Sequence, residues 1–285
     1  MQINRVDTWG TVYLNGELLP ARQAAISALD RGFLYGDGVF ETIRVYRGTP
    51  FMLDAHMNRM LHGCSVIALD PPDTEEIKRG IVEVLTANNL TDAYLRITIT
   101  RGATGMPWFD TAVRAPTTMI IARPLTAENH VQGIRLTVSG FRVDEQSPLT
   151  RVKQTGILWR ILARTNARRA GFDDALLLNT VGNVSEATSA NVFWVKSGHL
   201  FTPDTDCGLL PGITRSLVIQ IAETKNIPVI EGSFGLNDIF QADEVFLTNS
   251  ISELVPVQSL DERVFALAPG PVTMQLADGY RALTP

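Results

Sequence analysis

Strand patterns and helix patterns alternate in both halves of this 285-residue chain, and a polar segment separates the halves. Alternating or continuous apolar stretches of four to eight residues predict strands, and apolar residues spaced three and four apart predict amphipathic helices. Neither pattern continues through residues 123–130, Arg-Pro-Leu-Thr-Ala-Glu-Asn-His. We therefore expect an α/β (α+β) protein in which residues 1–123 form a smaller N-terminal domain, residues 124–133 a linker, and residues 134–285 a larger C-terminal domain.

The N-terminal half predicts a hairpin, two helices and three further strands. Asn15-Gly16 lies between two apolar runs, which indicates a hairpin over residues 11–20. Asp54 precedes apolar residues at helical spacing and is the expected N-cap of the first helix. The other expected elements are a strand at 39–46, a helix from about Thr74 to Asn88, and strands at 93–100 and 117–122.

The C-terminal half predicts three helices among four short strands. The first helix carries Ile161, Leu162 and Thr165 on the side that we expect to face the interior. The expected helices span residues 158–170, 214–225 and 271–283, and the expected strands span residues 134–139, 174–178, 191–195 and 244–248.

Composition narrows the class of protein and of partner. The net charge is −5 and no basic block is present, so nucleic acid and anionic membranes are poor partners. No apolar run approaches the length of a membrane span, and the N-terminus lacks the features of a signal peptide. The two cysteines, Cys64 and Cys207, have no metal-ligand spacing and are typical of a reducing compartment. We expect a soluble cytoplasmic protein without a metal site.

Lys153 follows a polar segment and precedes the apolar pattern of a helix, so it can be partly buried. Desolvation favours the neutral amine of a lysine, which is a nucleophile that forms Schiff bases with aldehydes. Pyridoxal phosphate, an aldehyde cofactor, also needs a carboxylate at its ring nitrogen and an anion site for its phosphate. Glu186 is a candidate for the carboxylate, and the turn at 210–214 leads into a helix whose first N–H groups favour an anion. A lone lysine is usually a solvated surface charge, but this ordered set indicates a cofactor site.

Seven segments carry a resemblance to one known family, in the family's order and nearly from end to end. They are residues 32–46 (Gly-Phe-Leu-Tyr-Gly-Asp-Gly-Val-Phe-Glu-Thr-Ile-Arg-Val-Tyr), 53–59 (Leu-Asp-Ala-His-Met-Asn-Arg), Lys153, 184–186 (Val-Ser-Glu), 190–193 (Ala-Asn-Val-Phe), 210–215 (Leu-Pro-Gly-Ile-Thr-Arg) and 247–250 (Leu-Thr-Asn-Ser). These segments resemble the class IV aminotransferases, the pyridoxal phosphate enzymes of fold type IV. That family includes branched-chain and D-amino acid aminotransferases, (R)-selective amine transaminases and aminodeoxychorismate lyase. The resemblance implies a two-domain fold with pyridoxal 5′-phosphate between the domains.

The resemblance also implies roles for residues around the cofactor. Lys153 would hold the cofactor and shuttle a proton at the substrate Cα, and Glu186 would face the ring nitrogen. Arg59 would bind the cofactor phosphate, for which its planar, permanently charged fork is suited. The remaining expected cofactor contacts are Gly212, Ile213, Thr214, Thr248 and Asn249, with Asn249 and Ser250 also presenting N–H groups to the substrate carboxylate.

Substrate specificity rests on fewer residues. Tyr35, Phe40 and Arg44 match positions that line the pocket of branched-chain enzymes. Tyr94 and Arg96 match a tyrosine that meets the α-carboxylate and an arginine that helps to receive an acidic side chain. Because side chains two apart on a strand share a face, both can contact one substrate, although half-buried packing is an alternative. We therefore favour transamination between aliphatic L-amino acids and 2-oxoglutarate.

Three departures from the branched-chain pattern leave two other activities open. Residues 154–159, just after Lys153, contain no tyrosine, whereas the family often places one there on the cofactor O3′. Glu41-Thr42-Ile43-Arg44 replaces the usual Glu-Gly-Ile-Arg, and with the segment 248–250 it resembles aminodeoxychorismate lyase, which forms 4-aminobenzoate. Thr100-Arg101-Gly102 resembles the D-amino acid and (R)-amine transaminases, but the Arg-x-His pair of the bacterial D-amino acid enzymes is missing.

Partners follow from the resemblance alone. It implies small amino and 2-oxo acids as ligands, and a homodimer or a higher homo-oligomer in which the loop 101–108 reaches the neighbouring subunit's active site.

Overall fold

A computed structural model describes residues 10–103, 115–125 and 133–285, which belong to two units. Of the described residues, the first unit contains 10–103, 115–125 and the short segment Val152–Gly156, and the second contains 133–151 and 157–284. Most of the loop at 101–108 and of the expected linker lies outside the described residues. Within the described ranges, no helix has both the length and the apolar character that a bilayer span requires.

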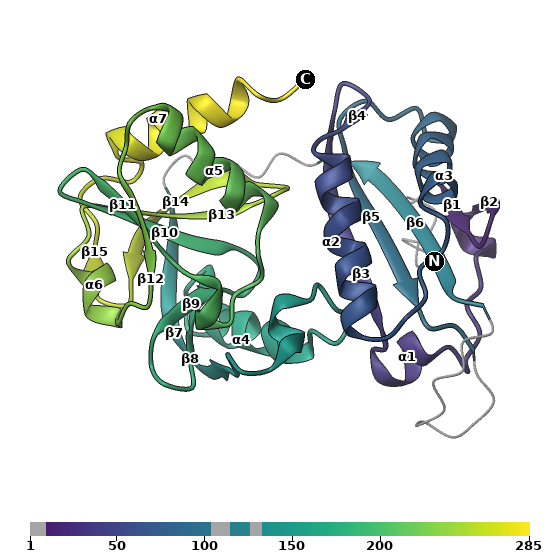
Figure 1. Ribbon diagram of the computed structural model, residues 1–285, viewed down its shortest axis with the longest axis horizontal. Coiled ribbons are helices and arrows are strands. Elements are labelled where there is room, and N and C mark those ends of the chain that lie inside the picture. Colours follow the sequence, from purple (N-terminus) through teal and green to yellow (C-terminus); the bar gives the residue numbers. More distant parts are fainter. Residues whose placement is uncertain (1–9, 104–114, 126–132) are drawn as a thin grey trace. The chain divides into compact units, whose positions relative to one another are not determined.

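The first unit is an antiparallel sheet with helices on one face (Figure 1). The order of its strands is β2 (Glu17–Pro20), β1 (Thr11–Leu14), β6 (Thr117–Pro124), β5 (Ala93–Thr100), β3 (Gly38–Tyr46) and β4 (Thr49–Pro50). Helix α2 (Leu53–Val66) packs on β3, and α3 (Thr74–Ala87) packs on β1 and β6. The short helix α1 (Arg31–Tyr35) precedes β3, and a 3-10 turn spans Ala21–Gln23.

Local sequence explains most of these elements. Asn15 and Gly16 both have positive φ, at 52° and 95°, so the predicted Asn-Gly hairpin is confirmed. Along β5, residues 93, 95, 97 and 99 are buried and residues 94, 96 and 98 are half-buried, as period-two alternation predicts. Each fully buried Leu or Ile on the helix-covered face contributes about 2 kcal/mol through removal of apolar surface from water.

The prediction that Asp54 caps α2 is wrong. The N-cap is Met52, which adopts a left-handed conformation, and Asp54 lies in the first turn of the helix. A carboxylate there still interacts favourably with the positive end of the helix dipole.

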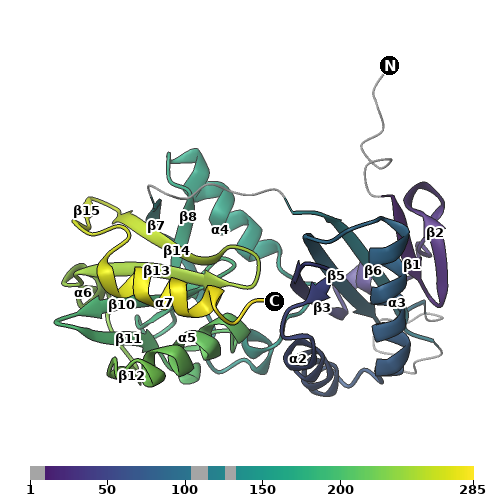
Figure 2. The ribbon, with the colours of Figure 1, turned by 90° about the horizontal axis from the view of Figure 1, so that it is seen from above.

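The second unit is built on a nine-stranded mixed sheet. Its order is β12 (Val229–Gly232), β11 (His199–Pro203), β10 (Asn191–Lys196), β13 (Glu244–Asn249), β14 (Glu253–Leu260), β7 (Ile134–Val143), β8 (Asp174–Asn179) and β9 (Val184–Ala187), with β15 (Arg263–Val264) paired to β14. Helices α5 (Ile213–Thr224) and α7 (Pro271–Arg281) pack on each other and on β13 (Figure 2). The remaining helices are α4 (Leu158–Arg169) and α6 (Leu236–Phe240), and 3-10 turns span Pro148–Arg151 and Thr205–Cys207.

Helix α4 is present as predicted, but its expected inward face is wrong. Ile161 and Leu162 are 52% and 43% exposed, whereas Ala163 and Ala167 are buried. The helix packs on β7 and β8 through these alanines, because their small side chains allow the backbones to approach closely. The larger apolar residues consequently face outward in the described chain.

The segment Val152–Gly156 packs with the first unit, although residues before and after it belong to the second. Val152 is buried in the core that α2 and β3 share, with residues such as Val39 and Met60. Gln154 forms an isolated bridge with Val39 on the edge of β3. We call residues 152–156 the lysine segment.

Candidate active site

The lysine segment is fixed to β3 by backbone hydrogen bonds. The Phe40 N–H donates to the Lys153 carbonyl over 2.8 Å, and the Thr155 N–H donates to the Gly38 carbonyl over 2.9 Å. These bonds hold the backbone of Lys153 on both sides, so the start of β3 sets the position from which its side chain extends.

Two cationic side chains lie over the ring of Phe40. The Lys153 Nζ is 4.8 Å from the ring centroid, and the Arg96 guanidinium carbon is 3.8 Å from it. Contacts of this kind hold a cation over the electron-rich face of an aromatic ring. Lys153 is half-buried, and its amine is thus near both an aromatic wall and a second positive charge.

Four of the predicted substrate residues lie on two adjacent strands, β3 and β5. Arg44 pairs with Tyr94 and Thr42 pairs with Arg96 across the antiparallel strands. Tyr94 and Arg96 are both half-buried, so they share a face of β5 as predicted. Arg96 donates to Thr98 Oγ1 over 3.1 Å and pairs with no carboxylate in the described part of the chain.

Tyr35 lies on a different element from the other predicted substrate residues. It ends α1 and is 49% exposed, with the Arg31 guanidinium 5.2 Å from its ring centroid. Four of the other predicted substrate residues lie on β3 and β5.

Arg59 is oriented by a buried carboxylate, Glu41, that was not among the site residues predicted from the sequence. Its Nε and Nη2 donate to the two oxygens of Glu41, each over 2.7 Å. His56 Nδ1 lies 2.7 Å from Glu41 Oε2. A signal was present, because Glu41 replaces an apolar residue in the inward series Val39, Ile43 and Val45, and a carboxylate buried there needs cationic partners.

Burial and neighbouring charges have opposite effects on the pKa of Glu41. Burial raises the pKa of Glu41, but the hydrogen bonds and charges of Arg59 and His56 outweigh it and lower the pKa to about 2. Burial, with the charges of Arg59 and Lys153, lowers the pKa of His56. At neutral pH His56 is therefore neutral, and its Nδ1–H donates to the Glu41 carboxylate.

In the second unit, Glu186 lies on β9, and its carboxylate accepts hydrogen bonds from side-chain and backbone donors. Arg160 Nη2 donates to its Oε1 over 2.6 Å. Asn191 Nδ2 donates to Oε2 and the Leu210 N–H donates to Oε1, both over 3.3 Å. The carboxylate is buried, and its contact with Leu210 places it beside the loop that enters α5.

The N-terminus of α5 has the properties of an anion site. Its N-cap is Gly212, and no described side chain caps the helix, which leaves its first N–H groups available to a ligand. A Cβ at residue 212 would collide with Asn191 Oδ1, so only glycine permits this approach. Thr214 is buried in the first turn, next to the predicted contact Ile213.

The end of β13 and the turn after it lie beside Asn191, which also contacts the loop that enters α5. Thr248 pairs with Asn191 across the strands, and its buried Oγ1 has no hydrogen-bond partner among the described residues. Asn249 Oδ1 accepts hydrogen bonds from the N–H groups of Ile251 and Ser252, over 2.9 and 2.8 Å. The Asn249 side chain thus fixes the turn that contains Ser250. An unsatisfied buried hydroxyl near a helix N-terminus fits a phosphate ligand.

The chain matches the family description "Amino-transferase class IV" over residues 38–260. It is 38% identical over 275 residues to a Methanocaldococcus jannaschii protein named as a candidate branched-chain-amino-acid aminotransferase, with 95% of each chain covered. It is 31% identical to the D-alanine aminotransferase of Bacillus licheniformis, with 92% of this chain and 93% of that protein covered. The chain belongs to the class IV aminotransferases, a family of pyridoxal 5′-phosphate enzymes, as the sequence predicted.

Solved structures agree with the predicted fold. The crystal structure of Escherichia coli branched-chain amino acid aminotransferase superposes with a TM-score of 0.91 at 32% identity, covering 96% of this chain and 94% of that one. The branched-chain aminotransferase of Thermoproteus uzoniensis, solved with norvaline, gives a TM-score of 0.87 at 35% identity, with 95% and 93% covered. Another branched-chain amino acid aminotransferase, solved with pyridoxamine 5′-phosphate, gives a TM-score of 0.90 at 30% identity. The chain therefore has the fold of type IV enzymes.

Proposed function

We propose that the chain moves an amino group between aliphatic L-amino acids and a 2-oxo acid such as 2-oxoglutarate, with pyridoxal 5′-phosphate held by Lys153. The observation that supports this most is the arrangement around Phe40. One apolar ring lies against both the Lys153 amine and the Arg96 guanidinium. A nucleophile, an aliphatic-binding wall and a fixed cation are the three groups that this pair of substrates requires.

The residues of the second unit fit the rest of the cofactor. The N–H groups at the start of α5 and the Thr248 hydroxyl suit the phosphate, and Arg59 of the first unit is a further candidate for it. Glu186 suits the ring nitrogen because it is a buried carboxylate. When bound, the cofactor supplies an electron-withdrawing ring that stabilises negative charge at the substrate Cα.

Lys153 would act as the acid and base of the reaction. Its Nζ would take the proton from the substrate Cα and deliver it to the cofactor carbon C4′. The bonds from Phe40 and Thr155 to the lysine segment keep the amine in one place during both transfers. Glu186 would hold a positive charge at the ring nitrogen, and Arg160 limits how strongly it does so.

Arg96 supports an acidic acceptor. It is half-buried and has no carboxylate partner among the described residues, and a guanidinium in that setting binds a carboxylate over two parallel hydrogen bonds. The distal carboxylate of 2-oxoglutarate would bind there, whereas aliphatic donors would contact Phe40. The similarity to branched-chain-amino-acid aminotransferases supports the same choice.

Aminodeoxychorismate lyase is a second candidate. The aminodeoxychorismate lyase of Bacillus subtilis is 29% identical over 95% of this chain, and the Phe40-Glu41-Thr42 and Thr248-Asn249-Ser250 segments resemble that activity. Transamination of D-amino acids has less support from the site. The Arg101 guanidinium binds Asp37 and two backbone carbonyls, so it is not available to capture a substrate carboxylate.

The test is to add one amine donor at a time, without acceptor, and to follow the absorbance of the bound cofactor. The panel is L-leucine, L-glutamate, D-alanine, (R)-1-phenylethylamine and 4-amino-4-deoxychorismate. We expect complete conversion to the amine form of the cofactor with L-leucine and L-glutamate. Release of 4-aminobenzoate without that conversion would establish the lyase, and reaction with D-alanine alone would reverse the assigned stereochemistry.

We also propose that the enzyme works in the cytoplasm as a homodimer. The support for the dimer is that each unit exposes large apolar side chains, namely Phe33 and Tyr35 on α1 of the first unit and Leu158 and Ile161 on α4 of the second. Sedimentation at several concentrations checks the assembly.

A further inference from the structure

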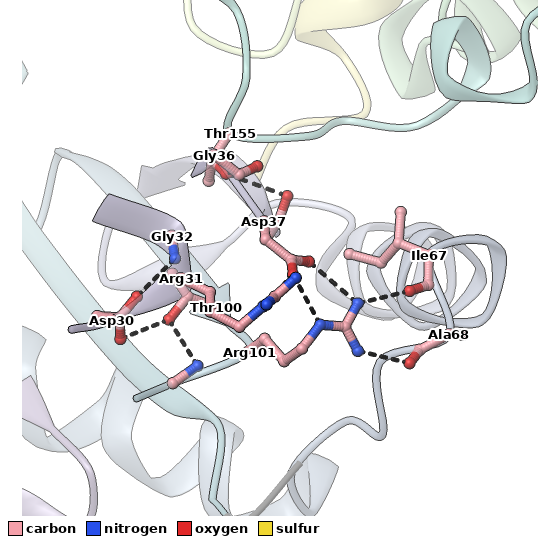
Figure 3. Close-up of polar contacts among 12 residues, drawn as sticks. Asp30, Arg31, Gly32, Gly36, Asp37, Ile67, Ala68, Thr100, Arg101 and Thr155 are labelled. Atoms are coloured by element: carbon pink, nitrogen blue, oxygen red, sulfur yellow. Dashed lines mark hydrogen bonds and ion pairs between the residues drawn. The ribbon is translucent and has the colours of Figure 1, made fainter. Parts of the chain in front are cut away.

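Arg101 ties together three segments of the first unit through its guanidinium group (Figure 3). Its Nε and Nη2 donate to the two carboxylate oxygens of Asp37 over 2.7 and 3.0 Å. Nη1 donates to the carbonyl of Ala68, and Nη2 also donates to that of Ile67, both over 2.7 Å. The side chain is 3% exposed, so these bonds form out of contact with water. The end of β5 is thereby joined to the C-terminal end of α2 and to the turn before β3.

Asp37 lies between two guanidinium groups. Besides Arg101, Arg31 donates to its Oδ2 over 2.8 Å, and Figure 3 shows the carboxylate facing both. Burial raises the pKa of Asp37, but the bonds from Arg101 and Arg31 outweigh burial and lower it. The carboxylate is therefore charged, and the bonds to it are of the stronger, charge-assisted kind.

The backbone carbonyls on both sides of Asp37 accept hydrogen bonds from the lysine segment. The Thr155 hydroxyl donates to the Gly36 carbonyl over 2.6 Å, and the Thr155 N–H donates to the Gly38 carbonyl over 2.9 Å. Gly36 has a φ of +69°, and a Cβ there would lie 3.1 Å from Gly156 Cα. The turn thus approaches the lysine segment closely in a conformation that glycine favours.

We infer that the Asp37–Arg101 pair is a clamp that positions Lys153, by fixing the turn at residues 36–38 to which the lysine segment is bonded. The inference rests on the proposed role of Lys153 as the cofactor lysine. Asp37 and Arg101 are positioning residues, because the bonds that carry their effect run through the backbone of the turn. The bonds between the Asp37 and Arg101 side chains limit the motion of the turn. The bonds from Thr155 to the turn, and from Phe40 to the Lys153 carbonyl, then limit the motion of the Lys153 backbone.

A change of the Asp37 carboxylate to an amide tests this chain of contacts. Asp37→Asn keeps the shape but turns an N–H group toward a guanidinium N–H, so at least one of the paired bonds is lost. Removing a charge-assisted hydrogen bond shifts an opening equilibrium about 10- to 100-fold. We expect hydrogen exchange at the amides of Thr155 and Phe40 to accelerate by that factor, in the full chain before any cofactor is added.

The second measurement is covalent attachment of pyridoxal 5′-phosphate. After borohydride reduction, peptide mapping locates the labelled lysine, and the time course of labelling gives the rate. We expect Asp37→Asn to label Lys153 more slowly than the wild type by about tenfold or more, with a lower kcat and a nearly unchanged KM. The matched control is Asp54→Asn, because the Asp54 side chain is 86% exposed and pairs only with Lys78 in the described chain.

The labelled position tests the role of Lys153, and the rates in Asp37→Asn test the clamp. Wild-type labelling at a lysine other than Lys153 would overturn the proposed function, whereas the exchange rates would still report on the contacts of the clamp. Labelling at Lys153 with wild-type exchange and attachment rates in Asp37→Asn would overturn the clamp alone. If Asp37→Asn does not fold, Thr155→Val replaces it, because valine removes only the bonds of the hydroxyl to the Gly36 and Gly38 carbonyls. Unchanged exchange and labelling in that variant would also reject the inference, and Thr155→Ser should restore both.

Discussion

The Arg160 guanidinium donates to the Glu186 carboxylate over 2.6 Å, so the residue expected to face the cofactor ring nitrogen already has a cationic partner in the same unit. Arg160 lies in the first turn of α4, seven positions after Lys153. It stacks on Trp159, with the guanidinium carbon 4.5 Å from the ring centroid. In the proposed holoenzyme, the Glu186 carboxylate would therefore interact with both Arg160 and the protonated ring nitrogen.

This shared contact predicts an unusual dependence of stability on cofactor. Arg160→Gln takes this cation away from a buried carboxylate and should lower the free energy of unfolding of the cofactor-free chain by about 3 kcal/mol. In the proposed site, bound cofactor would bring a positive ring nitrogen to the same carboxylate and should restore much of that loss. Urea unfolding with and without pyridoxal 5′-phosphate measures both values. An equal loss in the two states would show that Arg160 and the cofactor do not share Glu186.

The Glu41–His56–Arg59 group predicts acid sensitivity. Glu41 has a pKa of about 2 in the folded chain against an ordinary 4.5, so its contribution is complete above pH 4.5 and is lost as the pH falls toward 2. The pKa of His56 is lowered from 6.5, so the unfolded chain takes up a proton first and stability also falls below pH 6.5. Both effects have the same sign: stability decreases with acid.

The measurement is the free energy of unfolding between pH 7 and pH 2.5 for the wild type and Glu41→Gln. At pH 7 the variant should be less stable by on the order of 3 kcal/mol, because Arg59 loses its buried partner. The difference between the two proteins should shrink as the pH falls through the range from 4.5 to 2. Glu262→Gln, an exposed position, serves as the control. A difference that stays constant with pH would mean that Glu41 is not charged in the folded chain.

If Arg96 binds the distal carboxylate of 2-oxoglutarate, its loss should affect acidic acceptors more than aliphatic ones. Arg96→Gln removes the cation proposed for the distal carboxylate of 2-oxoglutarate, so KM for that acceptor should rise about 10- to 100-fold. KM for 4-methyl-2-oxopentanoate, which has no second carboxylate, should change less than threefold. Arg135→Gln is a suitable control because Arg135 is exposed and lies on β7. Equal effects on both acceptors would place Arg96 in general packing, the alternative that the sequence left open.

Much of the fold follows from local patterns, whereas the contacts that build the site do not. The Asn15-Gly16 turn and the alternation along β5 depend on neighbouring residues, and the sequence predicts both. The inward face of α4 could not be chosen in this way, because Ala163 and Ala167 are only weakly apolar and Ile161 and Leu162 are strongly so. The pattern finds an amphipathic helix but does not say which surface meets the sheet.

Long-range pairing explains the rest. Arg101 is 64 positions from Asp37, and the lysine segment bonds to β3 across more than 110 positions. No periodicity connects such residues. Family resemblance selected Lys153, Glu186 and Arg59 as single positions, but the groups that orient them, namely Thr155, Arg160 and Glu41, appear only when the chain is folded.

Adding a single methyl group at residue 212 should lower the affinity for the cofactor. Gly212→Ala would place a Cβ against Asn191 Oδ1, so Asn191 must move away from Glu186 and Leu210. The first N–H groups of α5 would shift with it, and the affinity for pyridoxal 5′-phosphate should fall about tenfold or more, since each lost phosphate contact of this kind is charge-assisted. Gly140→Ala is the matched control because a Cβ there meets nothing within 4 Å. Fluorescence titration of the cofactor-free chains compares the two dissociation constants. Unchanged affinity in Gly212→Ala would remove the α5 N-terminus from the phosphate site.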